Sequence, residues 1–252
     1  MPASDRPSDR PSDRPSDRPS ERRGAARTAV VWEGLRPVLE DVAARDVLDI
    51  GGGTGGFAAR VAELGHRVTV VDPSPDALAA LDRRARELGV EVRGQQGDLS
   101  TLLDVTGPDS ADVVLCHGVL EVVEDPAAAL ATIREVLRPG GTLSLLVAQR
   151  HAAVIARAMA GHFQQALGLL DATAPTGRAG RRFTHDEIVG LLAGAGFAPA
   201  SVHGIRVFAD LVPGSLLDLE PGATASLVEL EHAVATRPEF HPLAAQLHLI
   251  AQ

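Results

Sequence analysis

The chain is 252 residues long and 45% hydrophobic, enough to bury the core of one full domain with short additions. Its formal net charge of −9 argues against a protein that coats nucleic acid through general electrostatic attraction. Cys116 is the single cysteine, which excludes an intrachain disulfide and a cysteine-based metal cluster, and we expect no metal site.

The first 24 residues are hydrophilic, and residues 6–22 repeat the motif R-P-S-D with small changes. Such a segment has no apolar surface to bury against its conformational entropy, so we predict a disordered tail over residues 1–24 and a folded domain over residues 25–252. The tail does not resemble a signal peptide, and no apolar run reaches the ~20 residues that span a bilayer. We therefore expect a soluble, cytoplasmic protein with no membrane partner.

Apolar residues recur at spacings of three and four from Arg27 to Ala44, which predicts an amphipathic helix. The stretch from Asp46 to Phe57, D-V-L-D-I-G-G-G-T-G-G-F, then predicts a buried strand, a tight glycine turn and the start of a helix. Glycine suits this turn because it tolerates a positive φ and lets the backbone approach a ligand closely. We expect the turn to touch something small and polar.

The glycines alone leave the ligand open, because Gly51, Gly53 and Gly56 also fit the G-x-G-x-x-G spacing of dinucleotide enzymes. Asp49, inside the preceding strand, favours a different ligand. A carboxylate there repels a pyrophosphate but suits a ligand that carries a sulfonium or an ammonium group.

Strands and helices alternate along the next part of the chain, the order typical of a parallel α/β sheet. The predicted elements are the helix Phe57–Leu64, the strand Arg67–Asp72, the helix Ala77–Leu88, the strand Val90–Gln95, the short helix Ser100–Asp104, the strand Ala111–Cys116, the helix Ala127–Leu137 and, after a turn over Arg138–Gly141, the strand Thr142–Val147. Polar residues follow several strands. Asp72 ends the second, Asp98 follows the third, and His117 follows the fourth, where ligands bind in open α/β sheets.

Residues 150–182 hold five arginines against Asp171 alone, a local charge of +4 in an otherwise acidic chain. The arginines are Arg150, Arg157, Arg178, Arg181 and Arg182. This segment is either a solvated loop or an insertion that covers the substrate. Beyond it the pattern predicts the helix Thr184–Ala195, the strand Ser201–Phe208, the helix Ala223–Ala235 and the strand Ala244–Ala251.

The order of motifs over residues 45–148 resembles class I S-adenosylmethionine (SAM) methyltransferases. The resemblance implies a Rossmann-like α/β fold, with a seven-stranded, mostly parallel sheet, a reversed last strand and helices on both faces. The flanks resemble the tRNA 5-carboxymethoxyuridine methyltransferase family. The matching segments are R-T-A-V-V-W (27–32), H-G-V-L-E-V-V-E-D-P (117–126), G-H-F (161–163), G-I-R-V-F-A-D (204–210), the acidic pair around 229–231 and the final L-H-L-I-A.

The second resemblance implies methyl transfer from SAM to the carboxylate of 5-carboxymethoxyuridine at the tRNA wobble position. The residues that it places around SAM are Arg27, Gly51, Gly52, Asp72, Asp98, Leu99 and His117, and the strand and glycine turn described above add Asp49 and Gly53. Within this set Asp72 would bind the ribose and Asp98 the adenine; the alternative for each is to cap the turn or helix that follows. On the acceptor side the expected residues are Arg150, Arg178, Arg181, Arg182 and Arg206, with His117 and Arg206 able to position the acceptor.

Two other functions remain open from the sequence alone. One is a SAM-dependent methyltransferase that acts on a small molecule through a carboxylate or hydroxyl group. The other is a SAM-binding protein without turnover. A carboxylate acceptor with a pKa near ~4 is already ionised at neutral pH and needs no general base, and the sequence contains no obvious one.

Overall fold

A computed structural model describes residues 19–40, 42–172, 180–217 and 222–252 of the chain. Its centre is a seven-stranded sheet with the order β3-β2-β1-β4-β5-β7-β6. The strands are β1 Asp46–Ile50, β2 Arg67–Asp72, β3 Val92–Gln96, β4 Ala111–His117, β5 Leu137–Ala148, β6 Pro199–Ile205 and β7 Gln246–Ala251. Strands β1 to β5 pair in parallel, whereas β7 runs antiparallel to both β5 and β6. The predicted fold class and the reversed last strand are confirmed.

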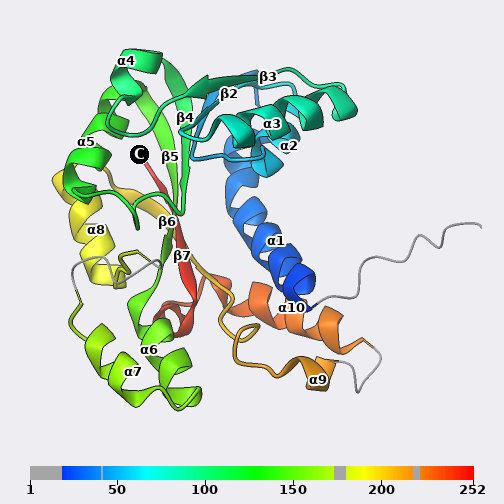
Figure 1. The fold of residues 1–252 in the computed structure, drawn as a ribbon, viewed down its shortest axis with the longest axis vertical. Helices are drawn as coiled ribbons and strands as arrows, with labels where there is room; N and C mark the ends of the chain where they lie inside the picture. The colour runs from blue at the N-terminus through cyan, green and yellow to red at the C-terminus, as the bar shows by residue number, and fades with distance from the viewer. Residues whose placement is uncertain (1–18, 41, 173–179, 218–221) are drawn as a thin grey trace, which may run out of the picture.

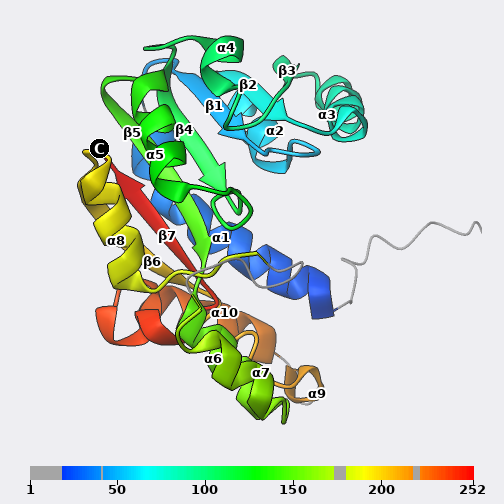
Figure 2. The same cartoon turned by 60° about the vertical axis from the view of Figure 1, so that its left-hand side comes forward.

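Helices cover both faces of the sheet (Figures 1 and 2). The α-helices are α1 Pro19–Leu39, α2 Gly56–Glu63, α3 Pro75–Leu88, α4 Leu102–Thr106, α5 Pro126–Val136, α6 Arg150–Met159, α7 Phe163–Leu169, α8 His185–Gly194, α9 Gly214–Leu217 and α10 Ala223–Ala235, and η2, Pro238–Leu243, is a 3₁₀ helix.

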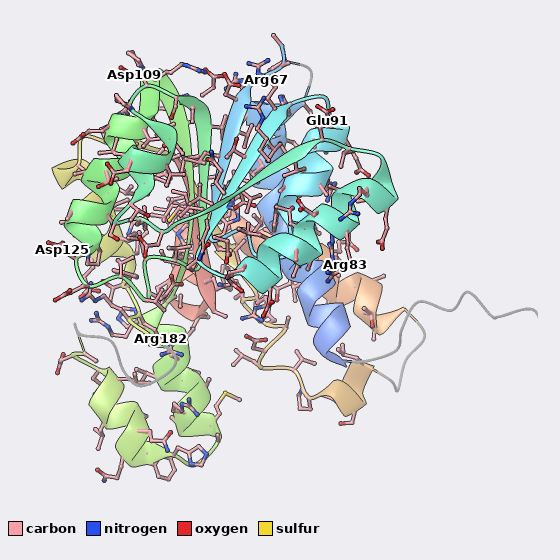
Figure 3. The ribbon with its side chains drawn as sticks, turned by 45° about the horizontal axis from the view of Figure 1, so that its top comes forward. Arg67, Arg83, Glu91, Asp109, Asp125 and Arg182 are labelled. Carbon is pink, nitrogen blue, oxygen red and sulfur yellow. The ribbon has the colours of Figure 1, made fainter. Side chains whose placement is uncertain are left out.

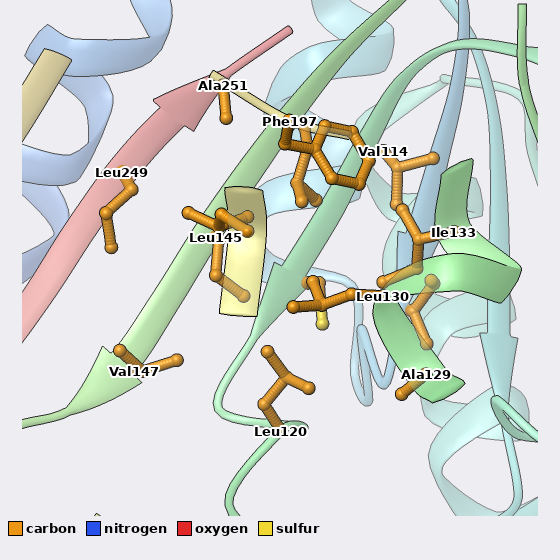
Figure 4. Packing of buried hydrophobic residues seen from close by; sticks show 14 of the residues in the cluster. Val114, Leu120, Ala129, Leu130, Ile133, Leu145, Val147, Phe197, Leu249 and Ala251 are labelled. Atoms are coloured by element: carbon orange, nitrogen blue, oxygen red, sulfur yellow. The ribbon is translucent and has the colours of Figure 1, made fainter. Parts of the chain in front are cut away.

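Two hydrophobic clusters hold these layers together. One lies between the sheet and helices α5 and α8, where Leu130, Ile133 and Ile188 are fully buried (Figure 4). The other lies on the opposite face and joins α1, α2 and α3 to the sheet through residues such as Leu35 and Leu81. Because both faces are covered, the central strands are apolar on both sides.

The structure differs from the sequence prediction at the first helix. Helix α1 begins at Pro19, eight residues before the predicted start, and ends at Leu39. Proline is compatible with this start because the first turn of a helix has no intrahelical use for its missing N–H. Residues 19–24 of the predicted tail are therefore helical, and residues 1–18 lie outside the described residues.

Two further differences lie around β5. This strand begins at Leu137, so the residues predicted as a turn before it belong to the strand. The segment after it, predicted only as an insertion or loop, contains the helices α6 and α7. The Gln149 side chain caps α6 by accepting a hydrogen bond from the Ala152 N–H over 3.0 Å.

Helix α1 lies against β6 and β7 at a glycine. A methyl group added at Gly34 would lie 2.9 Å from ring atoms of His248 and 3.2 Å from Cε1 of His203. Glycine is normally unfavourable inside a helix. Here it allows the helix to approach the two histidine rings.

We therefore predict that Gly34→Ala lowers the free energy of unfolding by about 1 kcal/mol or more, because overpacking outweighs the gain in helix propensity. The matched control is Gly190→Ala in α8, where nothing lies within 4 Å of the added methyl group. That variant should raise the free energy of unfolding by roughly 0.5–1 kcal/mol. Urea denaturation of both variants is the measurement, and equal stabilisation of both would contradict the close contact at Gly34.

Candidate functional site

The glycine turn after β1 is shaped by two close approaches. Gly51 has a φ of +65°, and a Cβ there would lie 2.7 Å from Cγ2 of Val119. A Cβ at Gly52 would lie 2.5 Å from the carboxylate of Asp49. Larger residues would therefore collide at both positions, and the backbone of the turn remains accessible at the carboxyl end of β1.

Asp72 ties this turn to the end of β2. One of its carboxylate oxygens accepts a hydrogen bond from the Gly53 N–H and the other from the Ser74 N–H, each over 2.9 Å. The following helix is capped by Ser74, whose hydroxyl accepts from the Ala77 N–H over 3.2 Å. Asp72 therefore does not cap that helix. Each carboxylate oxygen has a second acceptor site left for a ligand hydroxyl.

Asp49 lies behind the turn and is 3% exposed. Burial, with an additional contribution from the negative charge of Asp72, raises the pKa of Asp49 to about 7. Two neighbouring acids near the glycine turn thus create a region that favours a positively charged ligand.

Asp98 makes local hydrogen bonds at the end of β3. Its Oδ1 accepts from the Ser100 hydroxyl over 2.6 Å and from the Ser100 N–H over 2.9 Å, and these bonds lower the pKa of the carboxyl group. These bonds close the turn before α4, whose N-cap residue is Thr101, so Asp98 is not the N-cap of that helix. All the hydrogen bonds found for this side chain within the described residues use Oδ1, so a ligand could still use Oδ2. Leu99 beside it packs into the core.

His117 ends β4 and belongs to a row of polar side chains that crosses the sheet beneath α1. Its Nε2 lies 2.8 Å from Oγ of Ser144, and this oxygen lies 2.8 Å from Nε2 of His248. The serine hydroxyl carries one proton, so it donates to one imidazole and accepts from the other. Ser144 and His248 are fully buried, and the ring of Phe57 meets His117 edge-on at 5.3 Å.

Arg206 follows β6 in an uncommon backbone conformation with a φ of +56°. The buried carboxylate of Glu231 holds the next three residues by accepting hydrogen bonds from the backbone N–H groups of Val207, Phe208 and Ala209 over 2.7–2.8 Å. The Arg206 side chain pairs with Asp210 at 3.3 Å. Glu231 thus fixes the segment that carries Arg206, a role that the sequence alone did not reveal.

The structure separates the arginines of residues 150–182. Arg150 is 5% exposed and pairs with Glu187 at 2.7 Å, so its charge is used inside the protein. The expectation that Arg150 contacts a substrate is therefore wrong. Arg181 and Arg182 are partly exposed, and Arg178 lies outside the described residues, as does the side chain of Arg27.

Three further observations limit what this site can be. The described residues contain no group of three or more His, Cys, Asp or Glu side chains that could hold a metal ion. In the same part of the chain, no helix has the length and apolar character that crossing a membrane requires. Cys116 is buried, and burial raises the pKa of its thiol, so this side chain is unsuited to act as a nucleophile.

A cavity of about 970 Å³ lies elsewhere, at the amino ends of β1, β2 and β3. Its lining includes Asp46, Arg67 and Arg138, which are joined by ion pairs of 2.6 and 2.8 Å. Ligands of open α/β sheets bind at the carboxyl ends of the strands instead. The glycine turn, Asp72 and His117 at that opposite end therefore form the candidate site.

Comparisons with known proteins agree with this geometry. The chain shares its fold with the crystal structure of an S-adenosylmethionine-dependent methyltransferase from Mesorhizobium loti, at a TM-score of 0.59 and 21% identity, over 90% of this chain and 99% of that one. A family model described as a methyltransferase domain matches residues 48–145, which run from β1 into β5. The chain is a class I SAM-dependent methyltransferase.

Two curated relatives of this methyltransferase differ in how much of it they match. The tRNA 5-carboxymethoxyuridine methyltransferase of Escherichia coli strain K12 is 29% identical over 243 residues, which cover 91% of this chain and 89% of the relative. The ubiquinone biosynthesis O-methyltransferase of Xanthomonas campestris pv. campestris strain B100 is 36% identical over 134 residues, 50% of this chain and 56% of that protein. The first similarity includes the flanks of the methyltransferase domain.

The described residues of the methyltransferase fit SAM. The turn after β1 has room only for glycine at Gly51 and Gly52, so a ligand can approach its backbone. The carboxylates of Asp49 and Asp72 suit the positive charges of the sulfonium and ammonium groups, and Asp72 retains acceptor sites for hydroxyl groups.

The raised pKa of Asp49 predicts a pH dependence. Between about pH 4 and 7 the folded protein keeps a proton that the unfolded chain has released, so Asp49 makes the free energy of unfolding fall as the pH rises through this window. Asp49→Asn should flatten that dependence and raise the free energy of unfolding at pH 8 by at most about 4 kcal/mol. Asp49→Asn should also weaken SAM binding. In the wild type, SAM affinity should rise above pH 7 because Asp49 becomes ionised, and this rise should be smaller in the variant.

Urea denaturation at pH 5 and pH 8, with calorimetric titration of SAM at both values, measures these effects. Asp72→Ala is the matched comparison and should weaken SAM binding by about 1.5–3 kcal/mol. This variant should keep more of the pH dependence of the free energy of unfolding than Asp49→Asn does. Unchanged SAM affinity in Asp49→Asn would contradict a role for this carboxylate in binding the cofactor.

The polar row gives a second prediction. Ser144→Ala removes a hydrogen-bond partner of the buried His248 ring and of the partly buried His117 ring, so the free energy of unfolding should fall by about 2 kcal/mol or more. SAM affinity should also fall, because the His117 ring loses one of the contacts that orient it. The control is Ser201→Ala in β6, since the Ser201 side chain makes no hydrogen bond within the described residues. Loss of stability with intact SAM affinity would show that the row is purely structural.

Proposed function

We propose that this methyltransferase transfers the methyl group of SAM to the carboxylate of 5-carboxymethoxyuridine at the wobble position of tRNA. The observation that carries the proposal is the extent of the similarity to the Escherichia coli enzyme, 91% of this chain against 50% for the Xanthomonas relative. Residues outside the cofactor-binding part usually select the acceptor, so similarity there bears on the substrate. A tRNA substrate also implies work in the cytoplasm.

The proposed cofactor site lies at the carboxyl ends of β1, β2 and β4. Asp72 would accept from the ribose hydroxyls, Oδ2 of Asp98 from the adenine amino group, and the Leu99 N–H would bond to the adenine ring. Arg27 would pair with the methionine carboxylate. The other proposed contacts are Asp49, Gly51, Gly52, Gly53 and His117.

Methyl transfer to a carboxylate requires few catalytic groups from the protein. SAM supplies an electrophilic methyl group on its sulfonium. A carboxylate acceptor is ionised at neutral pH, so no side chain has to remove a proton from it. The contribution of the protein is then to hold the carboxylate oxygen in line with the methyl group and to exclude water, which is catalysis by orientation.

Arg181, Arg182 and Arg206 are the proposed acceptor-side residues among the described ones, and Arg178 is proposed from the sequence alone. Arg206 is suited to this task because Glu231 fixes the backbone beside it, which lowers the entropy cost of binding. His117 lies at the end of β4, where it can contact the cofactor or the acceptor.

A second candidate function is methylation of a small carboxylate- or hydroxyl-bearing molecule. The higher identity to the ubiquinone biosynthesis O-methyltransferase over half of the chain favours it, as does the net charge of −9. Binding of SAM without turnover is a third alternative, and an activity assay tests it directly.

The deciding experiment is mass spectrometry of nucleosides from total tRNA of the source organism, with and without this gene. We expect the methyl ester of 5-carboxymethoxyuridine to disappear from the deletion strain while the free acid accumulates. The purified protein with SAM should restore the ester on tRNA from that strain, and Asp72→Ala should not. If the wild-type cells contain neither nucleoside, the tRNA proposal fails and small carboxylic acids become the substrates to test.

A further inference from the structure

The hairpin of helices α6 and α7 carries more apolar surface than its own packing uses. Figure 1 shows the hairpin projecting from the end of β5, away from the body of the domain. In α7, Ala166 and Leu169 are buried. Phe163, Leu167 and Leu170 are 65%, 59% and 47% exposed.

Three of the exposed residues share one face of α7, and a fourth ends α6. Phe163, Leu167 and Leu170 follow the i, i+4, i+7 spacing of a single helix face. Met159, at the end of α6 and 65% exposed, lies four residues before Phe163. We call these four side chains the apolar stripe. Single exposed apolar residues need no explanation, but a group in one helical hairpin is typical of a binding surface.

Positive charge accompanies the stripe. Arg157 is exposed on α6, and Arg182 lies where the hairpin meets the body of the domain (Figure 3). Burial and the positive charge of Arg157 lower the pKa of Arg182, and the negative charge of Glu121 opposes them in part. The guanidinium groups of Arg157 and Arg182 are therefore close enough to repel each other. Neither forms an ion pair with a carboxylate within the described residues. Asp171 is the one acid among the described residues from 150 to 182.

We propose that the apolar stripe, with Arg157 and Arg182, is the docking surface for single-stranded RNA beside the methyl acceptor. This inference rests on the proposed tRNA function and names the part of the protein that holds the anticodon loop. Phe163 stacks on an unpaired base, and the arginines neutralise neighbouring phosphates. Proteins recognise unpaired RNA through this combination of an aromatic ring with positive charge.

The composition of the surface favours RNA over other occupants. A stable dimer needs roughly 800 Å² on each partner, from about 20–30 residues, whereas the stripe consists of four side chains on one short hairpin. A second copy of this chain has a net charge of −9 and could pair its acidic residues with the arginines. Such pairing would not require the aromatic ring of Phe163. An RNA strand uses both features at once.

The experiment measures binding of a synthetic anticodon stem-loop that carries 5-carboxymethoxyuridine, at several salt concentrations, for the wild type and three variants. Phe163→Leu keeps the position apolar but removes the ring, so affinity should fall at least about 5-fold with an unchanged salt slope. Phe163→Trp should retain the affinity. Arg157→Gln should reduce the slope of log K against log salt by about 1, because one phosphate contact is lost.

The readouts separate this inference from the proposed function. SAM affinity should be the same in all four proteins, and loss of SAM affinity in Phe163→Leu would overturn the inference by indicating a general defect. If the wild type methylates tRNA but Phe163→Leu binds the stem-loop as well as the wild type, the docking surface is wrong and the proposed function stands. If the wild type binds the stem-loop through Phe163 without methylating it, the docking surface stands and the assigned acceptor is wrong. A concentration-dependent dimer that Phe163→Leu dissolves in sedimentation would identify a second copy as the occupant and overturn the proposal.

Discussion

The candidate site depends on two acids that form no ion pair with a cationic side chain among the described residues. Asp49 is 3% exposed and Asp72 is 7% exposed, and each lies at the carboxyl end of a central strand. The negative charge of Asp72 helps to keep a proton on Asp49 at neutral pH. Such an arrangement costs stability in the free protein and is relieved by a ligand that brings positive charge. The sulfonium and ammonium groups of SAM are of this kind, so under the proposed cofactor site these carboxylates would contribute binding energy for SAM.

The polar row beneath α1 connects the cofactor region to the edge of the sheet. His117, Ser144 and His248 stand on adjacent strands, and α1 can cover them because Gly34 has no side chain. Helix α1 also carries Arg27 two turns before Gly34. The position of this helix on the sheet therefore determines both how the polar row is covered and where the backbone of Arg27, a proposed cofactor contact, lies.

The sequence predicted much of the fold because its signals were local. The strands β1, β2 and β4 are short apolar runs that are followed by Gly51 or end at Asp72 and His117. The acids Asp49 and Asp72 indicated the ligand before any geometry was known. The reversed last strand came from resemblance to a known family and not from the residues alone, and the order of the strands in the sheet was not predicted. Helix α7 was not predicted because its seven residues are too few for a periodic pattern to be recognised, and Gly161 separates it from α6.

Other features depend on contacts between distant parts of the chain. Ser144 and His248 are separated by 104 positions, and each is an isolated polar residue inside an apolar strand. The sequence showed the charge of Arg150 but not its partner Glu187, 37 positions later. The side chain of Arg150 is buried and its charge pairs within the protein. Glu231 could be recognised only once the three N–H groups after Arg206 were seen to converge on it.

If the acceptor is RNA, as proposed, the distribution of charge limits how this methyltransferase can recognise it. A chain with a net charge of −9 does not attract RNA over long distances, and electrostatic screening limits the reach of isolated arginines to about 10 Å. Recognition must then come from short-range contacts on a defined surface. Such contacts depend on geometry, so they discriminate between acceptors better than a broad basic surface would. In this chain they can be supplied by the α6–α7 hairpin, which is attached to the end of β5 and can vary without disturbing Asp49 and Asp72, the two carboxylates proposed to bind the cofactor.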